Sequence, residues 1–416
     1  MKYGLIGEHL SHSFSKNIHN MISSYDYSLC ELSKDEVKEF MLKHDFLGIN
    51  VTIPYKEEVL KYVDYKDPLV LEAGACNTII NKDGNLYAYN TDVLGFIKSL
   101  KANKIDVENK TALILGTGGA SKAIKVALEE LGINCIFIAS RESKPNTIEY
   151  SKLDGIKEDI DIIVNCTPNG MYPNEDIEPL IHLKDFPNLE SYIDLVYNPL
   201  NTNLMIEAKE LGIKATNGLY MLVSQAVYAY SLFFNKEYSD DLANEIYQKI
   251  YIKKRNVVLI GMPSAGKTTV GRLLAKELNN EYVDTDRLME SRISKRIKDY
   301  INEFGLLRFR ELECNTVKEV ANYSDKIICT GGGVVLNPLN MRRLAHNSII
   351  VFIDRRLDLL TPTDSRPLSS NQKDLERLYY ERIDLYKKYA DFRIENNTTL
   401  EDAMKNLIEV IKWKYL

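Results

Sequence analysis

The chain of 416 residues carries a formal net charge of −6 and six cysteines, with 45% hydrophobic and 27% charged residues. This length and composition predict two or three globular domains, each large enough for its own core. The acidic balance speaks against nucleic-acid and anionic-membrane partners, and cysteines without C-x-x-C spacing speak against a disulfide framework or a zinc site. The first residues follow a strand pattern instead of a signal peptide, and no apolar run reaches about 18 residues, so we expect a cytoplasmic protein without a membrane span.

Residues 1–100 alternate short β-type patterns with helical ones. We predict strands at 3–7, 27–32, 47–52, 77–80 and 86–89, and helices at 16–23, 34–43 and 56–62. A second α/β segment should contain strands at 111–115, 135–139, 161–165, 192–195 and 213–215, followed by helices at 219–234 and 239–251. After a short joint at 252–256, a third α/β unit runs from Val257 onward. The predicted fold class is therefore α/β with parallel sheets.

A glycine-rich loop follows the predicted strand at 111–115 and opens a helix whose apolar residues repeat at helical spacing. In this context the N–H groups of a helix N-terminus bind the pyrophosphate of a dinucleotide. The residues expected to form this cofactor site are Gly116, Gly118, Gly119 and Ala120. The next strand ends at Ser140 and Arg141, where an NAD-binding fold usually places an acidic residue, so NADP is favoured. Glu142 is adjacent, and NAD stays an alternative.

The run from Gly261 to Thr269 follows an apolar strand pattern and opens another helix. Its form, G-x-x-x-x-G-K-T, is that of a loop whose backbone N–H groups surround the phosphates of a nucleoside triphosphate. Lys267 would reach the terminal phosphates, and Thr268 would offer a hydroxyl to Mg²⁺. The predicted ATP-binding residues of this loop are Gly261, Pro263, Ser264, Ala265, Gly266, Lys267, Thr268 and Thr269.

Residues 1–252 resemble the shikimate dehydrogenase family through a series of motifs in one order. The motifs are Ser11-His12-Ser13-Phe14-Ser15, Gly48-Ile49-Asn50-Val51-Thr52-Ile53-Pro54-Tyr55-Lys56, Ala75-Cys76-Asn77-Thr78, Asn90-Thr91-Asp92, Asn165-Cys166-Thr167-Pro168-Asn169-Gly170-Met171, Asp194-Leu195-Val196-Tyr197-Asn198-Pro199 and Asn217-Gly218-Leu219-Tyr220-Met221-Leu222-Val223-Ser224-Gln225. The resemblance implies an NADP-binding Rossmann lobe at 101–218 and a substrate lobe made of residues 1–100 and 219–252.

Reduction of a ring ketone needs a hydride from the nicotinamide and a proton for the developing alkoxide. The resemblance implies that Lys56, supported by Asp92, is the acid; the alternative is a structural ion pair between two loops. It further implies that Gly218 and Met221 border the nicotinamide. The residues expected to bind the substrate are Ser13, Ser15, Thr52, Lys56, Asn77, Asp92, Tyr197 and Gln225. The sequence departs from the family at Lys16, where proline is frequent, and in a short Pro-containing segment after Arg141 that should stunt the usual helix.

Residues 253–416 resemble shikimate kinase. The matching pieces beyond the phosphate loop are Asp284-Thr285-Asp286, Phe309-Arg310-Glu311-Leu312-Glu313, Gly331-Gly332-Gly333, Asp364-Ser365-Arg366-Pro367-Leu368 and Glu381-Arg382. The resemblance implies that Asp286 holds the acceptor hydroxyl and that Arg366 closes over the transferring phosphoryl group. Arg310 and Arg382, beside Gly332 and Gly333, offer planar forks for a carboxylate, and Glu313 should orient Arg310. Because the strand before the three glycines lacks an acid, Asp284 is expected to join Thr268 at the metal.

Together the two resemblances imply a bifunctional enzyme of chorismate and aromatic amino acid biosynthesis. One half would reduce 3-dehydroshikimate to shikimate with NADPH, and the other would phosphorylate shikimate with ATP and Mg²⁺. Two alternatives stay open: a quinate/shikimate dehydrogenase that uses NAD beside a P-loop kinase of another small metabolite, or one half that is catalytically silent and serves binding or regulation. The sequence does not indicate the oligomeric state, and a homodimer is kept as a hypothesis.

Overall fold

The computed structural model describes residues 1–10, 13–362 and 371–415, with side chains described up to residue 411. The chain divides into two compact units, Met1–Lys249 and Ile250–Leu416. The boundary falls inside helix α8 (Asp240–Lys254), and strand β13 (Asn256–Ile260) begins directly after Arg255. The segment predicted as a joint at 252–256 is therefore mostly regular structure.

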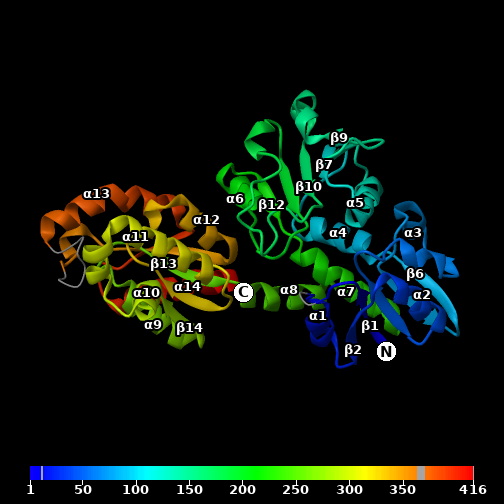
Figure 1. Ribbon diagram of the computed structural model, residues 1–416, viewed down its shortest axis with the longest axis horizontal. Helices are drawn as coiled ribbons and strands as arrows, with labels where there is room; N and C mark the ends of the chain where they lie inside the picture. Colours follow the sequence, from blue (N-terminus) through cyan, green and yellow to red (C-terminus); the bar gives the residue numbers. More distant parts are fainter. Residues whose placement is uncertain (11–12, 363–370, 416) are drawn as a thin grey trace. The chain divides into compact units, whose positions relative to one another are not determined.

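The first unit contains two sheets, of which the N-terminal one is mixed (Figure 1). In spatial order its strands are β2 (Tyr27–Glu31), β1 (Tyr3–Gly7), β3 (Gly48–Val51), β5 (Thr78–Lys82), β6 (Asn85–Tyr89) and β4 (Tyr65–Lys66). Strand β5 is antiparallel to both of its neighbours, and the other pairs are parallel. The helices of this part are α1 (Ser15–Ile22), α2 (Lys34–Lys43) and α3 (Pro68–Ala73). Ile6, Ile49 and Ile79 point into its buried core.

The second sheet of this unit is parallel throughout and has the doubly wound order. In spatial order its strands are β12 (Lys214–Thr216), β11 (Ser191–Asp194), β10 (Ile162–Asn165), β7 (Thr111–Leu115), β8 (Cys135–Ser140) and β9 (Ile148–Glu149). Its helices are α4 (Thr91–Ala102), α5 (Gly119–Glu130), α6 (Asn203–Glu210) and α7 (Leu219–Phe234). Helices α4 and α7 pack together between the two sheets (Figure 1). The winding direction reverses between β7 and β10, which is where such sheets bind ligands.

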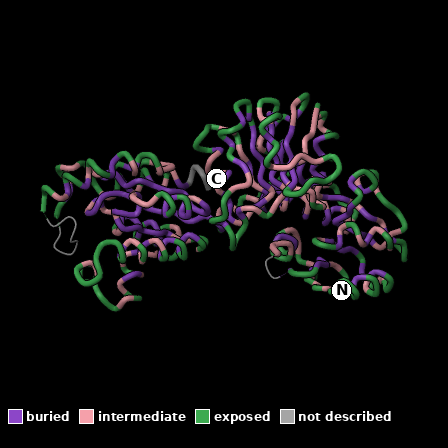
Figure 2. The backbone as a smooth tube through the Cα atoms, turned by 45° about the horizontal axis from the view of Figure 1, so that its top comes forward, coloured by how far each residue is buried: buried purple, intermediate pink, exposed green. Residues whose placement is uncertain are grey.

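The second unit is a five-stranded parallel sheet between helices, and its three central strands form the buried layer seen in Figure 2. In spatial order the strands are β14 (Glu281–Asp284), β15 (Lys326–Cys329), β13, β16 (Ser348–Asp354) and β17 (Phe392–Glu395). The helices are α9 (Lys267–Leu278), α10 (Thr285–Ile293), α11 (Ile297–Val320), α12 (Pro338–Asn347), α13 (Gln372–Tyr389) and α14 (Leu400–Tyr415). Gly305, with φ 83°, kinks α11. No described helix of either unit is long and apolar enough to cross a membrane.

The predicted α/β class with parallel sheets is confirmed, but the helix predicted at 56–62 is wrong. Only a short 3₁₀ helix, η1 (Glu58–Lys61), forms there, because the Lys56 carbonyl accepts the N–H of Cys76 at 2.9 Å instead of a helical N–H. Helices α3, α4 and α6 and strands β4 and β9 were not predicted. The stunted segment after β8 is confirmed, since two 3₁₀ helices, η2 (Tyr150–Gly155) and η3 (Lys157–Asp159), follow β9.

Candidate active sites

The glycine loop of the first unit lies where β7 ends. Gly116 has a φ of 102°, and a Cβ atom there would lie 2.8 Å from Thr167 Cγ2, so the position requires glycine. Gly118 is the N-cap of α5, and Gly119 and Ala120 lie in its first turn, where N–H groups have no acceptor within the helix. The loop therefore fits the pyrophosphate of a dinucleotide.

The end of β8 offers positive charge next to this loop. Ser140 is buried, and its Oγ accepts the Glu142 N–H at 3.4 Å. Arg141 is exposed, and its charge opposes the burial that raises the pKa of Tyr150 to about 12. Lys144 Nζ donates to Thr117 Oγ1 in the glycine loop at 3.1 Å. Sequence reasoning did not select Lys144, although a cation so soon after Arg141 was a usable signal for a phosphate site.

Lys56 and Asp92 form an ion pair between the turn after β3 and the first turn of α4. Lys56 Nζ lies 2.6 Å from Asp92 Oδ2, and the two side chains are only 17% and 14% exposed. A Cβ atom on Gly119 would lie 3.9 Å from Lys56 Cδ, so the lysine stem passes the start of α5. The pair therefore lies beside the glycine loop, where an ammonium group could donate a proton to a ligand.

Asn77 and Gln225 meet at the same end of the unit. Asn77 is buried, and its Oδ1 accepts the Thr91 N–H at 2.7 Å. Its Nδ2 lies 3.4 Å from Gln225 Oε1, and Gln225 Nε2 donates to the Leu222 carbonyl at 2.9 Å. These bonds fix the two amides, which suit recognition of a ring hydroxyl. Thr52, at the end of β3, is half-buried.

The remaining predicted residues lie around Tyr197. Ser13 Oγ accepts the Ser15 N–H at 3.2 Å, and the intervening Phe14 meets Tyr197 edge to face, with ring centroids 5.7 Å apart. Burial raises the pKa of Tyr197. A Cβ atom on Gly218 would lie 2.1 Å from the Leu195 carbonyl oxygen, so this contact requires glycine. Met221 is buried in the core formed by α4, α5 and the sheet. Ser11 and His12 of the first motif lie outside the described residues.

The phosphate loop of the second unit has the expected backbone. Gly261, Ser264 and Gly266 have φ values of 145°, 63° and 95°, which turn the chain around the start of α9. Lys267 Nζ donates to the carbonyls of Gly261 at 2.8 Å and Met262 at 3.0 Å, so the ammonium lies over the loop. Ala265 is buried, whereas Thr269 is exposed on α9.

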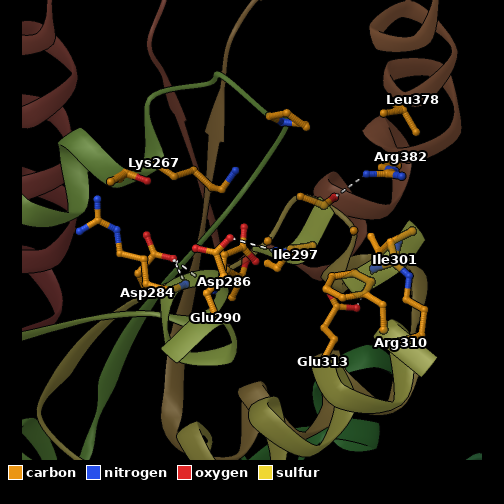
Figure 3. A pocket seen from close by; sticks show the side chains of 18 residues that line it. Lys267, Asp284, Asp286, Glu290, Ile297, Ile301, Arg310, Glu313, Leu378 and Arg382 are labelled. Carbon is orange, nitrogen blue, oxygen red and sulfur yellow. Dashed lines mark hydrogen bonds and ion pairs between the residues drawn. The ribbon is translucent and has the colours of Figure 1, made fainter. Parts of the chain in front are cut away.

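A cavity of about 360 Å³ opens beside this loop and collects most of the predicted kinase residues. Those that line it are Pro263, Lys267, Thr268, Asp284, Asp286, Arg310, Gly332, Gly333 and Arg382. Figure 3 shows Lys267, Asp284 and Asp286 at one end and Arg310 and Arg382 at the other. Arg366 lies outside the described residues.

Each of the two guanidinium groups donates a hydrogen bond to an oxygen atom of the protein. Arg310 Nη1 donates to Glu313 Oε2 at 2.7 Å, and burial raises the pKa of Glu313 while Arg310 opposes that shift. Arg382 is 3% exposed, and its Nη1 donates to the Gly332 carbonyl at 3.1 Å. Arg382 Nε donates no hydrogen bond within the described part of the chain. A Cβ atom on Gly333 would lie 2.4 Å from Arg310 Nη1, so glycine lets this side chain reach the cavity.

The acidic pair lies where β14 passes into α10. Asp284 Oδ1 accepts the N–H groups of Asp286 at 3.1 Å and Arg287 at 3.3 Å, and Tyr282 donates to Asp284 Oδ2 at 3.0 Å. A Cβ atom on Gly331 would lie 2.6 Å from Asp286 Oδ1. The described residues contain no cluster of three or more acidic, histidine or cysteine side chains that could hold a metal. Thr268 and Asp284, which both line the cavity, offer oxygen atoms, the ligand type that an ion such as Mg²⁺ takes together with phosphates and water.

Family models match both parts of the chain: "Shikimate dehydrogenase substrate binding domain" at residues 5–79 and "Shikimate kinase" at residues 263–412. A shikimate dehydrogenase (NADP(+)) from Clostridium beijerinckii is 37% identical over 260 residues, which cover 59% of this chain and 96% of that protein. The chain belongs to the shikimate dehydrogenase family. Residues 263–412 add a shikimate kinase domain.

Solved structures agree with the membership of the dehydrogenase family. Shikimate dehydrogenase 1 from Peptoclostridium difficile is 36% identical, with a TM-score of 0.55, and the match covers 60% of this chain and 98% of that one. A chorismate mutase/shikimate 5-dehydrogenase fusion protein from Clostridium acetobutylicum is 34% identical, with a TM-score of 0.56, and covers 60% of this chain and 96% of that one.

The kinase domain contains pocket residues that were not assigned to the site from the sequence. Ile297, Ile301 and Phe309 of α11 line the cavity, and Glu290 Oε1 accepts the Ile297 N–H at 3.0 Å. Tyr386 of α13 donates to the Gly332 carbonyl that Arg382 also contacts. The spacing of Ile297 and Ile301 by one helical turn was the available signal, but it is equally typical of an ordinary core face.

Proposed function

We propose that the chain catalyses two consecutive reactions, the NADPH-dependent reduction of 3-dehydroshikimate to shikimate and the ATP-dependent phosphorylation of shikimate to shikimate 3-phosphate. The observation that carries this proposal is the pairing of two different sites in one chain. One site places an ion-paired lysine beside a dinucleotide loop, and the other places a phosphate loop and two arginines at opposite ends of one cavity. The NADP(+) in the names of the relatives supports the choice of NADP over NAD.

In the dehydrogenase site, bound NADPH supplies the hydride. Lys56 donates the proton to the developing alkoxide, and Asp92 keeps the ammonium in place at 2.6 Å. Asn77 and Gln225 bind ring hydroxyls, together with Thr52. Ser13 and Ser15 hold the carboxylate. Tyr197 packs against the substrate, and Gly218 and Met221 border the nicotinamide.

In the kinase site, Lys267 binds the β and γ phosphates, and Thr268 and Asp284 hold Mg²⁺, which neutralises phosphate charge. Arg310 and Arg382 bind the carboxylate of shikimate at the far end of the cavity. Asp286, at the phosphate end, binds the acceptor hydroxyl and takes its proton. Arg366 is proposed to close over the transferring group, as the family resemblance implies.

A coupled assay with 3-dehydroshikimate, NADPH and ATP tests both activities through NADPH oxidation and ADP release. Lys56→Met should lower the reductase rate by about 10²- to 10⁴-fold and leave the kinase rate unchanged, since a general acid contributes that much. Lys267→Met should do the reverse. The exposed lysines Lys61 and Lys276 provide matched controls as Lys61→Met and Lys276→Met. If either of the first two variants abolishes both activities, the sites are not independent.

Cofactor choice is tested by rates with NADP and NAD. Arg141→Ala should reduce the preference for NADP, because this side chain and Lys144 supply the positive charge at the end of β8. A wild-type enzyme that prefers NAD and quinate would instead support the catabolic alternative.

We assign the dehydrogenase to residues 1–252, with a substrate lobe of 1–100 and 219–252 and an NADP lobe of 101–218, and the kinase to residues 253–416. Separate expression of the two pieces, with both activities measured, tests this division. Two further hypotheses, a homodimer and a cytoplasmic location, are tested by light scattering and by cell fractionation.

A further inference from the structure

Asp194 is a fully buried carboxylate outside the residues assigned to catalysis, and its two oxygens face different parts of the first unit. Oδ2 accepts hydrogen bonds from the hydroxyls of Tyr192 and Thr202, both at 2.7 Å. Tyr192 belongs to the apolar core, and Thr202 is the N-cap of α6, so this oxygen faces the scaffold. Oδ1 accepts Asn165 Nδ2 and the Val196 N–H, both at 3.0 Å, and so faces the loops that follow β10 and β11.

The Asn165 branch leads to the glycine loop. Asn165 pairs in register with Asp194 on one side and with Leu115 on the other, so three neighbouring strands end at one edge. Asn165 Oδ1 accepts both the N–H of Thr167, at 3.0 Å, and its hydroxyl, at 2.6 Å. The methyl group of Thr167 then packs against Gly116, as the 2.8 Å distance to an added Cβ shows.

The Val196 branch leads to the other side of the proposed nicotinamide position. The Val196 carbonyl accepts the Gly218 N–H at 3.1 Å, and the preceding Leu195 carbonyl packs against the Gly218 Cα. Tyr197, the next residue, contacts Phe14 between the two proposed carboxylate-binding serines. One carboxylate thus connects the scaffold with the loop on either side of the cofactor position.

Such an arrangement is costly unless the donors are in place. Burial raises the pKa of Asp194 to about 6, and the hydrogen bonds from Thr202, Tyr192, Val196 and Asn165 counteract that shift. A carboxylate in the interior is costly unless its oxygens accept hydrogen bonds, whereas an apolar side chain fills a core without that requirement. This contrast points to a role in orientation.

We propose that Asp194 is a positioning residue for the dehydrogenase reaction: it holds the Thr167–Gly116 contact and the Val196–Gly218 contact in register so that the cofactor binds in one orientation. The inference rests on the proposed NADPH-dependent activity. The two contacts are formed by loops that are distant in sequence. If Asp194 holds both of them, a substitution of Asp194 should disturb both loops together.

The test uses the full chain with three substitutions and three measurements that need no turnover: hydrogen–deuterium exchange, fluorescence titration with NADPH, and thermal melting. Asp194→Leu removes every acceptor, and we expect about tenfold or greater weakening of NADPH binding, with faster exchange at both 166–171 and 195–199. Asp194→Asn should retain near wild-type values, because its oxygen can face Asn165 and Val196 while its amide faces two hydroxyls that can accept. Tyr192→Phe removes a scaffold bond only, so it should lower the melting temperature but leave binding and both loops within about twofold of wild type.

The proposal is overturned if Asp194→Leu leaves binding and both loops as in wild type, or if Tyr192→Phe weakens binding as much as Asp194→Leu does. Kinase activity of the same chain reports its concentration. If Asp194→Leu leaves the first unit unfolded, Asn165→Leu is used instead, because it removes the Asn165 branch alone. Hydrogen–deuterium exchange should then rise at 166–171 and not at 195–199. An equal change in both segments, or a change in neither, contradicts the two-branch arrangement. Wild-type protein that does not bind NADPH at all would instead refute the proposed function.

Discussion

Replacement of Arg382 by lysine separates geometry from charge in the proposed shikimate site. The side chain is 4% exposed and its Nη1 is placed by the Gly332 carbonyl at 3.1 Å, so the planar fork has a fixed direction toward the cavity. Lysine keeps the positive charge but cannot form a two-pronged contact with a carboxylate. Loss of one charge-assisted hydrogen bond costs about 1.5–3 kcal/mol, so the KM for shikimate should rise about 10- to 150-fold. The KM for ATP and the kcat should change little, because the phosphate loop lies at the other end of the cavity.

The assay is initial-rate ADP release at varied shikimate and at varied ATP. Arg377→Lys is the matched control on the same helix, since Arg377 is 62% exposed and its distance to Glu381 Oε2 is 3.7 Å. This control should stay within about twofold of wild type, as exposed ion pairs contribute little. NADPH oxidation by the same preparation shows that the chain is intact. A KM for shikimate unchanged by Arg382→Lys, or a rise equal to that for ATP, refutes the assignment of Arg382 to the carboxylate.

Three further predictions concern the fold and the metal. Gly218→Ala places a Cβ atom 2.1 Å from the Leu195 carbonyl oxygen. The substitution should therefore lower both the melting temperature of the first unit and the reductase rate. The kinase rate, measured in parallel, should stay constant. Burial lowers the pKa of His19 to about 3. The neutral His19 ring therefore contributes its full stability above pH 6.5, the ordinary pKa of histidine, and this contribution is lost as the pH falls toward 3. Urea unfolding across this pH range should show that wild type loses stability relative to His19→Phe, and parallel curves would contradict the burial of a neutral ring. Chelation of Mg²⁺ by EDTA should abolish ADP release and spare NADPH oxidation; a kinase rate that survives exhaustive chelation would remove the metal from the mechanism.

Elements with strong local patterns were predictable from the sequence. The structure has β7 at Thr111–Leu115 and α7 at Leu219–Phe234, the bounds that apolar runs and helical spacing predicted. Both glycine loops were also identifiable, because their left-handed residues, such as Gly116 and Gly266, follow strands and open helices. These features depend on neighbours in sequence, which a single chain displays directly.

Features that depend on distant contacts were not predictable in the same way. Helix α4 was missed although it carries Asp92; it contains Gly95, a poor helix former that is needed because an added Cβ would lie 2.8 Å from the Met221 carbonyl oxygen of α7. Lys144 was not selected because its contact with Thr117 joins two loops 27 residues apart. The proposed role of Asp194 likewise depends on three strand ends that lie side by side but are distant in sequence.

The two arginines at the far end of the kinase cavity favour an acid over a neutral polyol. Arg310 is paired at 2.7 Å with Glu313, which is 3% exposed, whereas Arg382 is 3.9 Å from Glu381, which is 39% exposed. The buried Arg382 guanidinium is therefore only weakly compensated by a long contact to an exposed carboxylate, and the carboxylate of shikimate would pair with it more closely. Binding energy and selectivity then have the same origin.

In the proposed dehydrogenase site, the same selectivity would arise without a weakly paired arginine. Lys56 and Asp92 already neutralise each other at 2.6 Å. A second buried cation at this site, placed there to bind the substrate carboxylate, would have no partner whenever the substrate is absent. The hydroxyls of Ser13 and Ser15 are half-buried and can bind a carboxylate that keeps part of its hydration. In the proposed mechanism Lys56 would then be left to donate its proton at the ketone, because no substrate carboxylate would compete for its ammonium group. Two separate ways of binding one anion thus follow from two chemistries: phosphoryl transfer tolerates strong positive charge around the substrate, whereas ketone reduction needs its cation at the reacting oxygen.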